Sequence, residues 1–174
     1  MAKKRVLIDA CAILPAFHLK EWNRLCGHFD VETVDKVVDE TQASSNRRGY
    51  VKIDKAVLLR TLKKKHSVSD DDRALLAEKF MELGLDPVDD GERDLLAHFF
   101  CHEMPSPDTL LLTSADRNAI RATCILGWGD SLVSLEQLLR DCGAPDKAMR
   151  QLENHLKQGW LVEVRTGVAL GLNR

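Results

Sequence analysis

The sequence lacks a strong excess of charge of either sign, since 25 Lys and Arg residues face 27 Asp and Glu residues for a net charge of −2. Any case for binding nucleic acid must therefore rest on a local basic region. The five cysteines are odd in number and contain no Cys-x-x-Cys pair. We therefore expect reduced thiols in a cytoplasmic protein, not a disulfide scaffold.

Long hydrophobic runs, internal repeats and low-complexity segments are also missing. The first apolar run stops at Asp9, which is too early for a signal peptide or a membrane span. No membrane partner is therefore expected. The 174 residues, of which 44% are hydrophobic and 30% charged, are typical of one globular domain with a substantial core.

Short apolar runs alternate along the chain with segments of helical periodicity. This alternation predicts a central parallel sheet in a three-layer α/β/α sandwich. Strands are predicted at 5–8, 29–34, 109–113 and 131–133. Helices are predicted at 10–26, 36–43, 91–103, 117–126 and 135–141.

Two segments depart from this alternation. Residues 44–84 are polar and then rich in Lys and Arg, and they predict a helical insertion over one sheet edge, with a helix at 73–83. Residues 1–142 would then form one domain and residues 143–174 a C-terminal extension. The extension predicts a helix from Pro145 to Gly159, and then a hairpin of 160–165 and 168–170. It would pack on the domain or on a second subunit.

Several acidic side chains fall at strand ends or helix starts. Asp9 and Asp116 follow strongly apolar runs, so in a parallel sheet both would face the edge where open α/β folds bind ligands. Glu40 lies in the helix after the second strand, and Glu92 and Asp94 lie in the first turn of the 91–103 helix. We expect these five acids to meet at that edge.

Clustered carboxylates repel one another unless a cation neutralises them, and oxygen ligands favour Mg²⁺ or Mn²⁺ over Zn²⁺. Such ions activate water and stabilise charge on phosphate, which makes a phosphodiester the expected substrate. An acid at a helix start is, taken alone, more often a helix cap or dipole partner than a ligand, although Asp9 fits that explanation less well because it closes a buried strand. Only the joint pattern supports a metal site.

Four short motifs in this order resemble the PIN domain family, which includes the VapC-like ribonuclease toxins. The motifs are Val6-Leu7-Ile8-Asp9, Val37-Val38-Asp39-Glu40, Gly91-Glu92-Arg93-Asp94-Leu95-Leu96-Ala97 and Leu111-Leu112-Thr113-Ser114-Ala115-Asp116. Cys11 stands where the family often has asparagine or serine, and residues 44–72 and the tail after Asp141 have no counterpart in the minimal toxins.

The resemblance implies a PIN-like fold and a metal-dependent endoribonuclease, with RNA as substrate, an antitoxin protein as partner and a homodimer. It implies metal binding by Asp9, Glu40, Asp94 and Asp116, and a catalytic role for Glu92 as a ligand or as the base that orients water. Ser114, with Thr113 as the alternative, would be the hydroxyl partner of Asp116. A PIN-like scaffold that binds RNA or protein without cutting is the second hypothesis.

One segment of the chain is rich in Lys and Arg, and this basic block is the local positive region that could bind RNA phosphates. Its members are Arg47, Arg48, Lys52, Lys55, Arg60, Lys63, Lys64 and Lys65. A solvated helix face explains the same residues.

His98 and His102, with Cys101 between them, have a spacing that suggests zinc, but a histidine pair on a core helix is the preferred interpretation because no fourth ligand is near. Phosphoaspartate folds are disfavoured, since Cys11 replaces the second aspartate of one class and 131–134 lack the lysine of the other.

Overall fold

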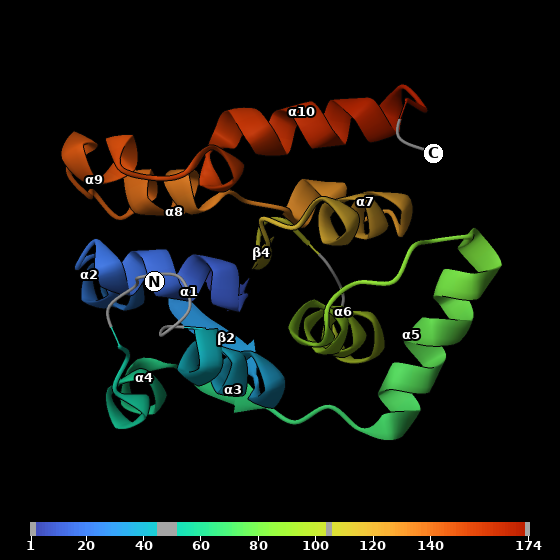
Figure 1. The fold of residues 1–174 in the computed structure, drawn as a ribbon, viewed down its shortest axis with the longest axis horizontal. Helices are drawn as coiled ribbons and strands as arrows, with labels where there is room; N and C mark the ends of the chain where they lie inside the picture. The colour runs from blue at the N-terminus through green and yellow to red at the C-terminus, as the bar shows by residue number, and fades with distance from the viewer. Residues whose placement is uncertain (1–2, 45–51, 104–105, 173–174) are drawn as a thin grey trace.

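A four-stranded, all-parallel sheet forms the centre of the computed structural model, which describes residues 3–44, 52–103 and 106–172 (Figure 1). The strands lie side by side in the order β3-β2-β1-β4. Their bounds are β1 Arg5–Ile8, β2 Asp30–Val34, β3 Lys64–His66 and β4 Leu110–Thr113. Val6, Leu7 and Ile8 of β1 are completely buried, which confirms the interpretation of this run as a central strand.

Helices connect the strands and cover the sheet. Before β4 they are α1 Ala10–His18, α2 Trp22–His28, α3 Asp35–Ser44, α4 Lys55–Thr61, α5 Asp70–Leu83 and α6 Asp90–His102. After β4 they are α7 Arg117–Ile125, the 3₁₀ turn η1 Gly129–Ser131, α8 Leu135–Asp141, α9 Asp146–Arg150, the 3₁₀ turn η2 Asn154–Leu156 and α10 Gln158–Ala169.

The direction of the connections reverses once. The chain steps from β1 to β2 to β3, and then crosses back to β4 on the other side of β1. Right-handed connections place the helices before and after such a reversal on opposite faces of the sheet, which is consistent with a three-layer α/β/α sandwich. The reversal also makes the carboxyl ends of β1 and β4 the switch point, where open α/β sheets bind ligands.

The helix predicted at 10–26 is two helices instead of one. Lys20 has a φ of 64°, in the left-handed region, and α1 ends one residue earlier at its cap Leu19. A lysine seldom adopts this conformation, and no glycine or proline marks the break. The sequence pattern therefore contained no stop signal at this point.

The segment predicted as a helical insertion, 44–84, also contributes a strand. Its helices α4 and α5 flank β3, which pairs in parallel with β2 and forms one edge of the sheet. The lysines of β3 are exposed, and charged side chains are common on edge strands because they discourage pairing with other chains. The prediction of a helical insertion therefore missed one strand between its helices, because three residues are too few for a readable period-two pattern.

The strand predicted at 131–133 is reduced to one bridge. Leu132 pairs in parallel with Leu112, and Val133 N donates to Leu112 O at 3.0 Å. Ser134 then caps α8 by accepting from Gln137 N, and this cap ends the extended segment.

The C-terminal hairpin was also predicted wrongly, because residues 158–169 form the helix α10. Leu161, Val164 and Gly167 recur at helical spacing and are buried, and α10 packs against α7 (Figure 1). The β-branched residues and glycines suggested strands, but burial of this face against α7 decides the conformation. The predicted helix 145–159 is likewise divided between α9, η2 and the first turn of α10.

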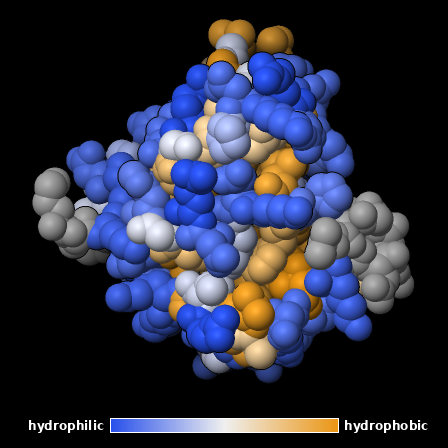
Figure 2. All heavy atoms as spheres, turned by 90° about the vertical axis from the view of Figure 1, so that its left-hand side faces the viewer, coloured by the Kyte–Doolittle hydropathy of each residue, from blue (hydrophilic) through white to orange (hydrophobic). Residues whose placement is uncertain are grey.

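The outer surface is mostly polar on the face shown in Figure 2, where hydrophobic side chains form a band right of centre and appear again at the top of the view. Within residues 3–44, 52–103 and 106–172, no helix combines the length and apolar character needed to cross a membrane.

Candidate functional site

The carboxyl edge of the sheet brings four of the predicted acids together. Asp9 directly follows β1, and its backbone N donates to Thr113 O at the end of β4 at 3.3 Å. Glu40 comes from α3, Glu92 from the first turn of α6, and Asp116 from the start of α7. We call Asp9, Glu40, Glu92 and Asp116 the acid cluster.

Asp9 is the most enclosed member of the cluster, with an exposed fraction of 2%. It caps α1, because its Oδ2 accepts from Cys11 N at 3.2 Å. Its Oδ1 is buried and has no hydrogen-bond partner among the described residues. A buried carboxylate oxygen without a partner is unfavourable, so this position favours a ligand that carries positive charge.

Burial and mutual repulsion shift the pKa values of Asp9, Glu40 and Glu92 upward. Burial raises the pKa of Asp9. The pKa of Glu92 rises to about 9, first through burial and then through the charges of Asp9 and Asp116. Burial also raises the pKa of Glu40, with a further contribution from Asp9. No ion pair among the described residues includes a member of the cluster, so the metal-free site is electrostatically unfavourable.

Gly91 allows Glu40 to approach the start of α6. Its backbone N donates to Glu40 Oε1 at 2.9 Å, and a Cβ at this position would collide with the Glu40 carboxylate. The Gly91-Glu92 pair therefore has two physical roles, since the glycine admits one acid and the next residue supplies another.

We expect Gly91→Ala to displace Glu40 and to weaken Mn²⁺ binding roughly tenfold, which corresponds to about 1.4 kcal/mol. The unfolding temperature should change little, because a flexible glutamate side chain can move away from the added methyl group. Gly159→Ala is the matched control, since nothing lies within 4 Å of its added Cβ. Mn²⁺ titrations of the two variants would contradict this account if their affinities were equal.

Two adjoining cavities open over the cluster. One, of about 500 Å³, is lined by Asp9, Glu40 and Glu92, and the other, of about 600 Å³, by Glu92 and Asp116. Cys11, Asp89 and Glu92 line both. Asp89 was missed in the sequence, although it stands at the cap position of α6 and makes no side-chain cap hydrogen bond. The acidic run before Gly91 was the signal that could have identified it.

The donor chemistry of the cluster fits a hard divalent cation, because every candidate ligand is a carboxylate oxygen. Within the described residues, however, no three His, Cys, Asp or Glu side chains are already arranged to hold a metal ion. Binding would require side-chain rotation of Glu40, Glu92 or Asp116 toward Asp9.

Asp94 does not join the cluster, in contrast to the prediction from sequence. Its carboxylate faces α5 and binds Arg73, with Nε to Oδ1 at 2.8 Å and one terminal nitrogen to Oδ2 at 2.7 Å. It lines neither acidic cavity. A carboxylate held by two guanidinium hydrogen bonds is already neutralised, so Asp94 fixes α6 against α5.

We expect Asp94→Asn to lower the free energy of unfolding by about 2 kcal/mol, because a buried partner of Arg73 loses its charge. Mn²⁺ affinity should stay within about twofold, a difference of about 0.4 kcal/mol. Asp70→Asn is the control, since Asp70 pairs with the same Arg73 but its side chain is 98% exposed. A loss of Mn²⁺ binding in Asp94→Asn without loss of stability would restore Asp94 as a ligand.

The two residues predicted as hydroxyl partners of Asp116 lie at the end of β4 and directly after it. Ser114 Oγ accepts from the backbone N of Asp116 at 3.2 Å and does not bond to its carboxylate. Thr113 is buried at the end of β4. The Asp116 carboxylate itself caps α7 by accepting from Ala119 N at 2.8 Å, and the residue stays exposed.

The basic block is only partly described, because Arg47 and Arg48 lie outside the described residues. Its described members are exposed, and none of them lines either acidic cavity. Lys55 pairs with Asp39 at 3.3 Å and Lys65 pairs with Asp35. Lys52, Lys63 and Lys64 therefore contribute to neither cavity over the acid cluster.

The histidines that suggested zinc belong to a row of three rings, in which His98 and His66 are buried and His102 is exposed. The ring centroid of His98 lies 3.8 Å from the ring centroid of His66 and 5.3 Å from that of His102. Burial and the charge of His66 lower the pKa of His98 to about 4. His66 Nε2 lies 2.7 Å from Glu32 Oε2. The described side chains form no metal-binding group here either, and the row is part of the packing between sheet and helix.

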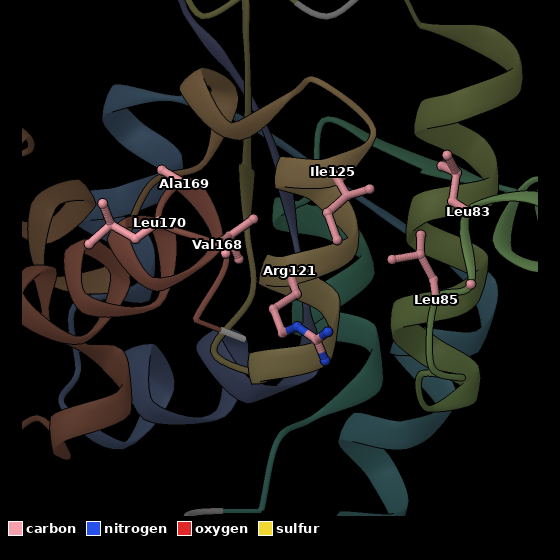
Figure 3. A pocket seen from close by; sticks show the side chains of 9 residues that line it. Leu83, Leu85, Arg121, Ile125, Val168, Ala169 and Leu170 are labelled. Carbon is pink, nitrogen blue, oxygen red and sulfur yellow. The ribbon is translucent and has the colours of Figure 1, made fainter. Parts of the chain in front are cut away.

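A third cavity, of about 750 Å³, lies away from the acids. It is bordered by the end of α5, by α7 and by the end of α10, and Figure 3 shows Arg121 between the apolar side chains Leu85 and Val168. No acidic residue lines it, so it offers no chemistry related to the cluster.

Comparisons with protein-family models, with curated proteins and with solved structures found no match to the chain.

Proposed function

We propose that the chain is a metal-dependent endoribonuclease that resembles the PIN domain family. The observation that carries the proposal is the buried Asp9, whose Oδ1 has no partner among the described residues and whose charge raises the pKa of Glu40 and Glu92. A divalent cation would give Asp9 Oδ1 a partner and would offset the repulsion that raises the two pKa values. Carboxylate ligands favour Mg²⁺ or Mn²⁺ for this role.

Asp9, Glu40 and Asp116 would hold the ion, which when bound supplies Lewis-acid stabilisation of the phosphate and activation of water. Glu92 lines both acidic cavities, so it can reach a phosphate in either. The pKa of Glu92, about 9 without the ion, would fall toward its ordinary value beside a bound cation, and the carboxylate would then accept the proton that the attacking water loses. Asp94 has no part in this scheme.

RNA is preferred as substrate because of the four motifs shared with the PIN family. A role as the toxin of a toxin–antitoxin pair, an antitoxin partner and a homodimer rest on the same resemblance alone.

Cleavage of a labelled single-stranded RNA tests the proposal. We expect cleavage with Mn²⁺ or Mg²⁺, none with EDTA, and none by Asp9→Asn. Asp71→Asn, an exposed acid on α5, is the matched control and should cleave at the wild-type rate.

Two outcomes would contradict the proposal. Equal cleavage by the wild type and by Asp9→Asn would contradict the metal-dependent mechanism. RNA binding without cleavage in either ion would favour the scaffold hypothesis.

A further inference from the structure

The C-terminal extension supplies one wall of the acidic site. Glu153 and His155, at the turn η2, line the same cavity as Glu92 and Asp116. They belong to the C-terminal extension, residues 143–174, which lies outside the four motifs that supply the acid cluster. The site is therefore built from the sheet edge and from this added segment together.

The turn is held in place by contacts on both sides. Trp160 Nε1 donates to Ala115 O at 3.3 Å, beside Asp116, and the Arg117 guanidinium lies 4.7 Å from the Trp160 ring centre. Gln158 N donates to Glu136 Oε2 at 2.8 Å. Leu156 is 3% exposed and belongs to the main core. These contacts fix the position of His155 relative to the acid cluster.

His155 differs in charge from the other polar side chains of the two cavities. The remaining polar lining groups in the described residues are carboxylates and the Cys11 thiol. His155 is thus the one lining side chain there that can carry positive charge. Its Nδ1 lies 3.5 Å from Glu153 Oε2, which orients the ring and leaves Nε2 as the second nitrogen.

We propose, on the basis of the ribonuclease function above, that His155 contacts the substrate and donates a hydrogen bond from its imidazole to a phosphate oxygen of the RNA. An anionic strand that enters a cavity lined by acids needs a donor besides the metal ion, and the described part of the basic block does not line this cavity. Glu153 acts through His155, as a positioning residue.

Steady-state cleavage of a short single-stranded RNA with Mn²⁺ tests the inference in four proteins: wild type, His155→Ala, His155→Gln and His28→Ala. We expect His155→Ala to lower kcat/KM about tenfold to a hundredfold, because a hydrogen bond to a charged group is lost. His155→Gln keeps an N–H donor and should recover most of this loss. His28→Ala replaces an exposed histidine on α2 and should match the wild type.

RNA binding without cleavage provides a second readout, which a merely structural role would not change. In the Asp9→Asn background, the added His155→Ala substitution should weaken RNA binding about tenfold, at an unchanged unfolding temperature.

Unchanged kcat/KM in His155→Ala, with Asp9→Asn inactive, would overturn this inference and leave the ribonuclease proposal standing. A loss that glutamine does not recover, together with a lowered unfolding temperature, would also overturn it. A wild-type protein that cleaves no RNA would overturn both proposals.

Discussion

Asp9→Asn is expected to lower RNA cleavage by about 10²- to 10⁴-fold and, at the same time, to stabilise the metal-free protein. Activity falls because the most buried oxygen ligand of the cluster is replaced by an amide. Stability rises because Asp9 has a raised pKa, which means that the folded state disfavours a charge that the unfolded chain carries freely. The gain should appear as a higher free energy of unfolding for Asp9→Asn than for the wild type near pH 7.

Cleavage rates and urea unfolding in EDTA measure the two effects on the same samples. The opposite signs separate a ligand role from a structural one, since loss of a purely structural group lowers activity and stability together. A destabilised Asp9→Asn protein, or one with wild-type cleavage, would contradict the expectation.

Glu92 is expected to make the metal-free protein less stable as the pH rises from about 6.5 to about 8. Its pKa in the folded protein is raised to about 9 from the ordinary value of 4.5, so in this range the folded state holds a proton that the unfolded state has lost. Stability from the protonated group is complete below the unfolded pKa and disappears as the pH passes the folded pKa. The decrease across the range should be about 1 to 2 kcal/mol.

The chosen range avoids the histidine and the cysteine thiols with shifted pKa values. His98, with its pKa lowered to about 4, has the opposite effect but only below the ordinary histidine value of 6.5. The buried thiols, such as Cys26 with its pKa raised to about 12, contribute mainly above the range. Urea unfolding at several pH values measures the slope, and Glu78→Gln, on the exposed face of α5, is the control.

Glu92→Gln should flatten this pH dependence and also lower kcat by about 10²- to 10⁴-fold, through loss of the general base. Saturating Mn²⁺ should flatten the wild-type curve in the same way. A slope that persists in Glu92→Gln would show that another group causes it.

The position of the acid cluster could be predicted in large part from the sequence. Asp9 and Asp116 follow apolar runs, and parallel strands bring such residues to one edge without further information. The choice between Glu92 and Asp94 could not be made in this way. Two positions apart on a helix differ by about 200° in direction. Which one faces the sheet edge depends on the rotation of α6, which its packing on α5 and the Arg73–Asp94 pair determine.

Tertiary contacts also explain the other differences. The strand β3 is defined by its pairing with β2, and three residues containing two exposed lysines carry no periodic signal of their own. The helix α10 contains glycine and β-branched residues and depends on its packing against α7. The role of Glu153 and His155 follows from that same packing, because it brings residues more than thirty positions beyond Asp116 to its side.

Calorimetric titration of Mn²⁺ into the wild-type protein and into Asp9→Asn tests most directly whether the acid cluster is a metal site. We expect binding to the wild type near pH 7, with release of protons because ion binding returns the raised carboxyl pKa values, including that of Glu92, toward their ordinary range. Asp9→Asn should show no comparable binding. The absence of binding to the wild type, or equal binding to both proteins, would contradict the account.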